Sequence, residues 1–184
     1  MPSPAVSAAA ARSVFRRFRR NRRGSAAVEF ALVAPVFFAL LFAIIETGII
    51  FFFASQVLET VTQNSARQIL TGQAQGANYA QWNNFRDGVV CAQIPALFNC
   101  ANIYVNVQST SQFSNAVIKN MIDASGNFDP STLGYSPGGP GDTVVVQLFY
   151  QWPLFVTGLG YNIANLSGNK RLLVATAAFQ NEPY

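Results

Sequence analysis

The sequence contains no histidine and only two cysteines among its 184 residues. The absence of histidine removes the side chain that most often serves as a general acid or base near neutral pH. It also leaves too few nitrogen and sulfur ligands for a zinc site. We find no glycine-rich phosphate cradle and recognise no nucleophile elbow. The sequence therefore predicts no enzymatic activity, no metal, no cofactor and no small-molecule substrate.

Charge is scarce, at 11% of residues, and it is unevenly distributed. No acidic residue precedes Glu29, whereas seven of the 12 Lys+Arg residues lie near the N-terminus: Arg12, Arg16, Arg17, Arg19, Arg20, Arg22 and Arg23. Beyond residue 24 the remaining 12 − 7 = 5 basic residues face 8 acidic ones, a net charge of −3. This later part gives no electrostatic reason to bind nucleic acid. Next to an apolar run, the arginines favour a cytoplasmic topology signal over a nucleic-acid-binding arm.

The apolar run extends over residues 26–54 and is interrupted by acids only at Glu29 and Glu46. As a helix it would be about 40 Å long, and about 20 residues suffice to cross the hydrocarbon core of a bilayer. It is too long for the apolar region of a secretory signal peptide, and Phe52 lies where cleavage would need a small residue. The remaining interpretations are an uncleaved membrane anchor and a helix preceded by a leader that is cut off in front of it.

The residues at the start of the apolar run favour the cleaved leader. Gly24 precedes Ser25, and Glu29 is the fifth residue counted from Ser25. This arrangement resembles the processing site of a type IV prepilin. The sequence GSAAVEFALVAPVFFALLFAIIETG, together with YQWPL at residues 150–154 and the closing NEPY, resembles TadE-like proteins of the tight-adherence (Flp-type) pilus system.

This resemblance implies a function as a pseudopilin or minor pilin in pilus assembly. It implies a single-pass protein of the inner membrane, with its C-terminal domain in the periplasm and a place in the pilus as a further possibility. The implied partners are inner-membrane lipid, other pilins or pseudopilins, proteins of the assembly platform, and the prepilin peptidase that removes the leader. The alternative is an uncleaved bitopic adaptor or scaffold of the pilus or secretion machine.

The two glutamates of the apolar run need partners, because a carboxylate inside a membrane costs several kcal/mol unless it is paired or near an interface. Cleavage after Gly24 would free an ammonium group on Ser25, close to Glu29; otherwise Glu29 reaches the headgroups and the arginines. Glu46 lies 17 positions further, about 25 Å along an ideal helix. It is expected at the outer interface or, alternatively, against a partner helix.

Small residues recur every four positions along the same helix. Pro35 removes one helical hydrogen bond, a change that neighbouring helices can accommodate in a membrane. Small side chains at this spacing permit close helix approach. The predicted helix-packing residues are Ala27, Ala31, Pro35, Ala39, Ala43 and Thr47.

The rest of the chain predicts a small α+β domain. Apolar residues at helical spacing extend the long helix to about Leu70, with Gly72 and Gly76 ending it. A short helix is expected after a cap at Asn78, and another within residues 111–124. Strands at residues 103–107, 143–151 and 172–180 form an antiparallel three-stranded sheet, and residues 125–142 form a surface loop. The predicted parts are a leader (1–24), a membrane helix with its extension (25–72) and an exported domain (73–184).

Two further features concern the exported domain. Cys91 and Cys100 are nine positions apart, and on the exported side of a membrane they predict a disulfide. Residues 154–166 are apolar but at about 13 residues too short to span a bilayer, so they are expected as a loop near the membrane surface.

Overall fold

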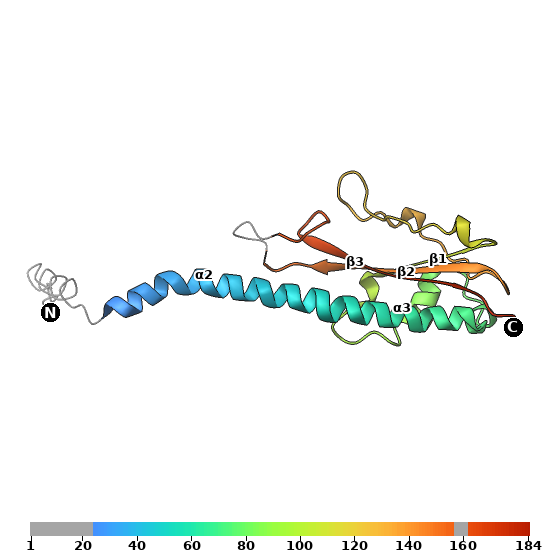
Figure 1. The fold of residues 1–184 in the computed structure, drawn as a ribbon, viewed down its shortest axis with the longest axis horizontal. Helices are drawn as coiled ribbons and strands as arrows, with labels where there is room; N and C mark the ends of the chain where they lie inside the picture. The colour runs from blue at the N-terminus through green and yellow to red at the C-terminus, as the bar shows by residue number, and fades with distance from the viewer. Residues whose placement is uncertain (1–23, 157–161) are drawn as a thin grey trace, which may run out of the picture. The chain divides into compact units, whose positions relative to one another are not determined.

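The computed structural model of the chain describes residues 24–156 and 162–184. The chain divides into two units, Met1–Phe42 and Ala43–Tyr184. The first unit is helical from Ser25 onwards, and the second contains a sheet and several short helices (Figure 1). Apart from Gly24, the predicted leader lies outside the described residues.

Three helical elements follow one another without a break: α2 (Ser25–Gly48), the π-helical turn η2 (Ile49–Ala54) and α3 (Ser55–Leu70). They make a helix of 46 residues, with Pro35 inside α2. The helix ends at Gly72, whose φ of +77° is a conformation that favours glycine. A Cβ atom there would lie 2.6 Å from the ring of Tyr184. The predicted end near Leu70 is confirmed.

Short helical turns follow the long helix. They are α4 (Gln73–Gly76), α5 (Trp82–Phe85), the π-helical turn η3 (Arg86–Val90) and the 3-10 turn η4 (Cys100–Asn102). The predicted helix after residue 78 is thus present as α5 and η3. Its predicted cap at Asn78 is wrong, because Asn78 has a φ of +53° and Gln81 is the residue that precedes α5.

The sheet contains β1 (Ile103–Thr110), β2 (Thr143–Pro153) and β3 (Lys170–Gln180), in that order and antiparallel. The register places Val105 opposite Leu148 and Leu148 opposite Ala175. The predicted α+β fold with a three-stranded antiparallel sheet is confirmed. β2 extends to Pro153, which pairs with Lys170 at the end of the strand, where proline is tolerated.

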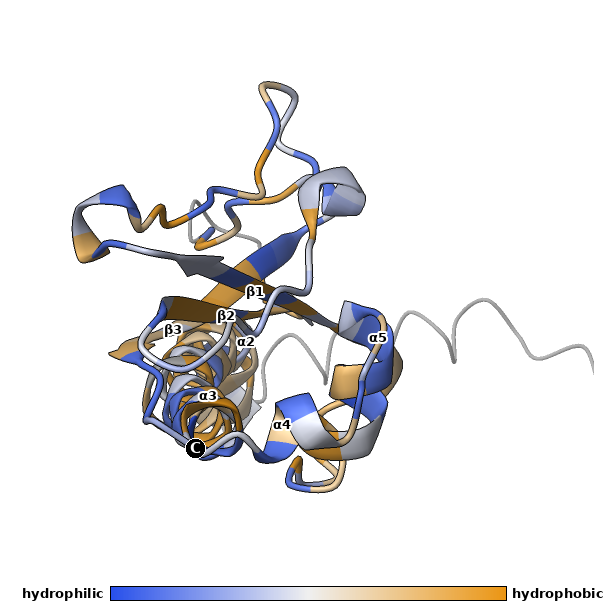
Figure 2. Cartoon of the chain, turned by 90° about the vertical axis from the view of Figure 1, so that its right-hand side faces the viewer, coloured by the Kyte–Doolittle hydropathy of each residue, from blue (hydrophilic) through white to orange (hydrophobic). Residues whose placement is uncertain are grey.

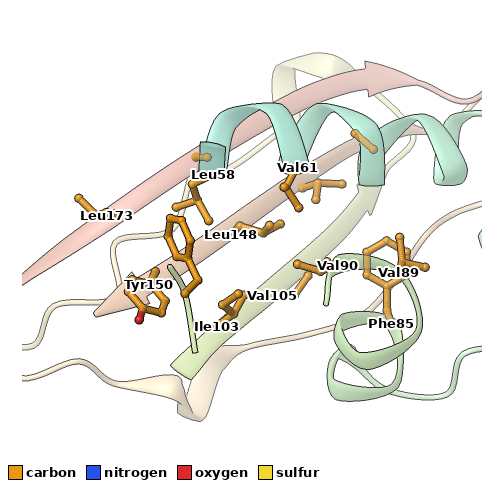
Figure 3. Close-up of a cluster of buried hydrophobic side chains, with 14 of the residues drawn as sticks. Leu58, Val61, Phe85, Val89, Val90, Ile103, Val105, Leu148, Tyr150 and Leu173 are labelled. Atoms are coloured by element: carbon orange, nitrogen blue, oxygen red, sulfur yellow. The ribbon is translucent and has the colours of Figure 1, made fainter. Parts of the chain in front are cut away.

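One face of the sheet packs against α3, which runs along β3 and β2 (Figure 1). The apolar positions of α3 recur at helical spacing, and alternate residues of the strands face them. The resulting core includes Leu58 and Val61 of α3, Val105 of β1, Leu148 of β2 and Leu173 of β3 (Figure 3). Phe85 of α5 and Val90 of η3 belong to the same core and pack beside β1.

The opposite face of the sheet is covered by the irregular chain between β1 and β2, as the end-on view in Figure 2 shows. This segment, residues 111–142, is called the cover below. The predicted helix within residues 111–124 is wrong: only the 3-10 turn η5 (Phe113–Asn115) forms there. The reason is Gln147 of β2. Its Oε1 accepts from the backbone N–H of Lys119 at 3.1 Å, and its Nε2 donates to the Lys119 carbonyl at 3.3 Å. Both backbone groups of Lys119 are thereby used outside a helix.

The remaining part of this cover holds the turn η6 (Pro130–Thr132) and an edge contact to β1. The backbone N–H of Val107 donates to the Gly134 carbonyl, and that of Ser136 donates to the Val107 carbonyl, both at 2.9 Å. These bonds occupy the outer edge of β1 at that point, which keeps the edge from pairing with other strands.

Candidate functional site

The described part of the first unit exposes an apolar helix surface on all sides. Large side chains of α2 are 44–73% exposed between Val28 and Phe38, including Phe30, Leu32, Val33, Val36 and Phe37. Within the described residues, one helix, Ser25–Leu70, is long and apolar enough to cross a membrane. Such a surface needs lipid or other helices around it, because apolar surface of this extent is unfavourable in water.

The structure brings together two of the three predicted processing-site residues. Ser25 is the first residue of α2, and its hydroxyl donates to Glu29 Oε1 at 3.0 Å, one helical turn away. Gly24 precedes the helix, and apart from its chain neighbours no described residue has an atom within 4 Å of where its Cβ would be. All three residues are exposed. The Gly24–Ser25 bond therefore lies at an accessible helix end, with a carboxylate beside the nitrogen that cleavage would free.

The predicted helix-packing residues all lie on α2, but they do not form one straight face. Each step of four residues turns about 40° around the helix, so the five steps from Ala27 to Thr47 turn about 200°. Ala27 and Ala31 are exposed, whereas Ala43 is 5% exposed. The Thr47 hydroxyl donates to the Ala43 carbonyl at 2.8 Å.

Glu46 has partners that the sequence did not predict. Its Oε1 accepts from the backbone N–H of Phe155 at 2.5 Å, and its Oε2 accepts from that of Val156 at 2.9 Å. The two carboxylate oxygens of Glu46 and the two adjacent backbone N–H groups form a paired contact, called the fork below. The fork connects the segment that follows β2 to the helix. Neither predicted environment, an outer interface or a partner helix, included this contact within the chain. The sequence does hold one related signal: no acidic or basic side chain occurs from Trp152 to Asn169, as suits a segment that lies against an apolar helix.

The predicted disulfide between Cys91 and Cys100 is present. Their Cα atoms are 5.7 Å apart, within the usual range for a disulfide. Asp87 Oδ1 lies 3.9 Å from the sulfur of Cys91, so an acid and two sulfurs cluster here. Because the sulfurs are bonded to each other, the cluster offers no thiolate to a metal.

Residues 134–138 read G-Y-S-P-G and so have the spacing of a nucleophile elbow, contrary to the expectation that the sequence holds none. An elbow needs a strand leading into a helix. Here Ser136 lies in a loop against β1, and its hydroxyl pairs with that of Ser109 at 2.7 Å. The segment therefore has the motif without its structural context.

Ionisable groups of the cover have local partners. Hydrogen bonds from the backbone N–H groups of Asn127 and Ser125 lower the pKa of Asp123, and hydrogen bonds from Ser131 lower that of Asp129. Burial raises the pKa of Tyr135 to about 12, with Tyr79 adding to the shift. These carboxylates stabilise turns, the ordinary use of aspartate in such loops.

An exposed apolar helix that continues directly into the packing helix of an α+β domain defines a class: small domains carried on a helix of membrane-spanning length. Residues 24–67 match the model of the family described as TadE-like protein. The match begins at Gly24 and covers α2, η2 and most of α3, which confirms the predicted resemblance to TadE-like proteins over this segment. No curated protein and no solved structure matches the chain.

Proposed function

We propose that the protein is a pseudopilin or minor pilin that supports assembly of an adhesive Flp-type pilus. It is anchored in the inner membrane by its N-terminal helix, with its N-terminus cytoplasmic and residues 73–184 in the periplasm. A prepilin peptidase cleaves between Gly24 and Ser25. The mature protein then packs through its helix with other pilins and with the assembly platform.

One observation carries this proposal: the run of arginines ends where the helix begins. Gly24 directly precedes the first helical residue, the family match starts at that glycine, and a glutamate occupies the fifth helical position. A carboxylate hydrogen-bonded to Ser25 is well placed to pair with the ammonium group that cleavage creates. The role is structural, and the cleavage chemistry belongs to the peptidase.

The second candidate is an uncleaved bitopic adaptor of the pilus or secretion machine. The hydrogen bonds from Phe155 and Val156 to Glu46 favour neither candidate, because they hold the domain on its own helix in both. The measurable difference between the two candidates is whether the Gly24–Ser25 bond is cleaved.

Replacing Gly24 with valine tests the choice in cells that contain the active peptidase. The bulkier side chain is expected to block cleavage, so that the longer precursor accumulates in membranes. Gly48→Val is the matched control, since Gly48 is the last residue of α2 and, like Gly24, contacts no side chain at its Cβ position beyond its chain neighbours. Equal processing of Gly24→Val and wild type would reject the pilin assignment, and the absence of cleavage in both would favour the uncleaved adaptor.

A further inference from the structure

The connection that follows β2 presents a large aromatic side chain beside the apolar helix. Leu154 is 8% exposed and belongs to the core, whereas Phe155 is 83% exposed, the highest value among the large apolar side chains whose exposure the structure describes. The Glu46 carboxylate holds the backbone at Phe155 and Val156. Phe155 therefore projects from a fixed backbone at the level of Glu46.

The level of Glu46 along the helix can be compared with the thickness of a bilayer. Glu46 lies 20 residues after Ala26, about 30 Å along a helix, which is the thickness of the hydrocarbon core. The apolar run continues to Ala54, about 12 Å further, and there Phe52 is 78% and Phe53 65% exposed. With Ala26 placed at the inner edge of the hydrocarbon core, the residues beyond Glu46 face the outer headgroups. Glu46 thus falls at the boundary between acyl chains and outer headgroups.

The chemistry of the segment suits this depth. From Trp152 to Asn169 the sequence contains no acidic or basic side chain. The fork of two N–H groups supplies the Glu46 carboxylate with hydrogen bonds that water would otherwise provide, which lowers the cost of placing it near lipid. The same fork satisfies two backbone donors at the strand end, as irregular backbone at membrane depth requires.

We propose that Phe155 is a lipid anchor: it inserts at the boundary of acyl chains and headgroups in the periplasmic leaflet, and Glu46 fixes the backbone that presents it. The inference rests on the proposed membrane anchoring by α2. The occupant is lipid because the backbone at Phe155 is bonded to Glu46, and the neighbouring helix residues Ile44 and Ile45 are themselves exposed and apolar. The anchor gives the domain a second attachment point, so that it is held at the membrane surface.

Site-directed spin labelling of the full chain in phosphatidylethanolamine–phosphatidylglycerol vesicles tests the proposal. A nitroxide is attached to Phe155→Cys, with the native disulfide left closed, and its collisions with oxygen and with a water-soluble nickel complex are measured. Oxygen concentrates in lipid and the nickel complex in water. Phe37→Cys in α2 is the lipid reference, and Phe113→Cys, at a side chain 70% exposed on the cover, is the water reference.

The expected oxygen-to-nickel ratio at Phe155 is several-fold higher than at Phe113 and approaches that at Phe37. A ratio at Phe155 equal to that at Phe113, with Phe37 in lipid, overturns the anchor while membrane insertion stands. Low collision rates with both reagents at Phe155 would mean that protein, such as a second copy, covers it, and would also overturn the proposal. A nickel-accessible Phe37 would instead reject the proposed insertion of α2.

Discussion

At the scale of single residues, Glu46 determines how the end of β2 is held. A carboxylate in an apolar run is costly unless hydrogen-bonded, and here the two backbone N–H groups of Phe155 and Val156 supply the bonds. Because both residues belong to the same compact unit as Glu46, the contact is part of the folded domain. Glu46 is thus a structural acceptor within the folded domain.

Glu46→Ala is expected to release the segment that contains Phe155 and Val156. Hydrogen bonds to a charged group contribute about 1.5–3 kcal/mol each, so amide exchange of these two residues should quicken by about ten- to a hundredfold. Hydrogen–deuterium exchange of the protein in bicelles measures the change. Glu59→Ala is the control, because that half-buried glutamate accepts from the Gln63 side chain on the same helix. Unchanged exchange at residues 155–156 in Glu46→Ala would show that the fork does not hold this segment.

At the scale of elements, Gln147 connects the sheet to the chain that covers it. It is fully buried in the middle of β2, where it contacts Asn106 of β1 and both backbone groups of Lys119. A buried amide is tolerated because its groups are hydrogen-bonded. The Gln147 amide bonds the backbone N–H and carbonyl of Lys119 as a neighbouring strand would. It thereby fixes the extended chain that follows η5.

Gln147→Ala is expected to detach this cover and expose Lys119 to trypsin. Cleavage after Lys119 should become several-fold faster than in wild type, because proteolysis requires local opening of the chain. Gln151→Ala is the matched control on the same strand, since the Gln151 side chain accepts from Lys170 at 3.3 Å and lies at the strand end. If both variants are cut at the wild-type rate while circular dichroism shows intact folds, Gln147 does not hold the cover.

The elements that the sequence predicted are those with a local signal. Helical spacing of Leu58, Val61 and Ile69 gave the packing face of α3, and alternation gave the buried face of β1. The extended cover was not predicted, because Phe113, Val117 and Ile118 stand near helical spacing but are all exposed, and the bonds that shape the segment come from Gln147, about 30 residues away.

The same distinction holds for the candidate site. Gly24, Ser25 and Glu29 lie within one short segment, so their pattern is visible in the sequence, and the structure adds the bond between Ser25 and Glu29. The partners of Glu46 lie 109 and 110 positions away, and they are backbone groups, which leave no mark on residue type.

At the scale of the whole molecule, the helix and the domain have different surfaces and different roles. The surface of α2 is apolar and exposed, whereas the chain beyond residue 24 has a net negative charge. The helix requires lipid or partner helices, whereas the domain has its own core and a disulfide that closes a loop of about ten residues. Such a loop adds about 2.5–3 kcal/mol of stability in the chain-entropy model. In the proposed function, the helix provides assembly and the domain follows it out of the cytoplasm.

The central claim is that this helix becomes the N-terminus of the mature protein. Intact-mass measurement of wild-type protein, extracted from membranes of cells with an active prepilin peptidase, tests it most directly. We predict a mass that corresponds to residues 25–184 with the disulfide closed, so that Ser25 carries the free amine beside Glu29. A mass that retains the arginine-rich residues before Gly24 would contradict the proposal and leave a tethered, uncleaved adaptor.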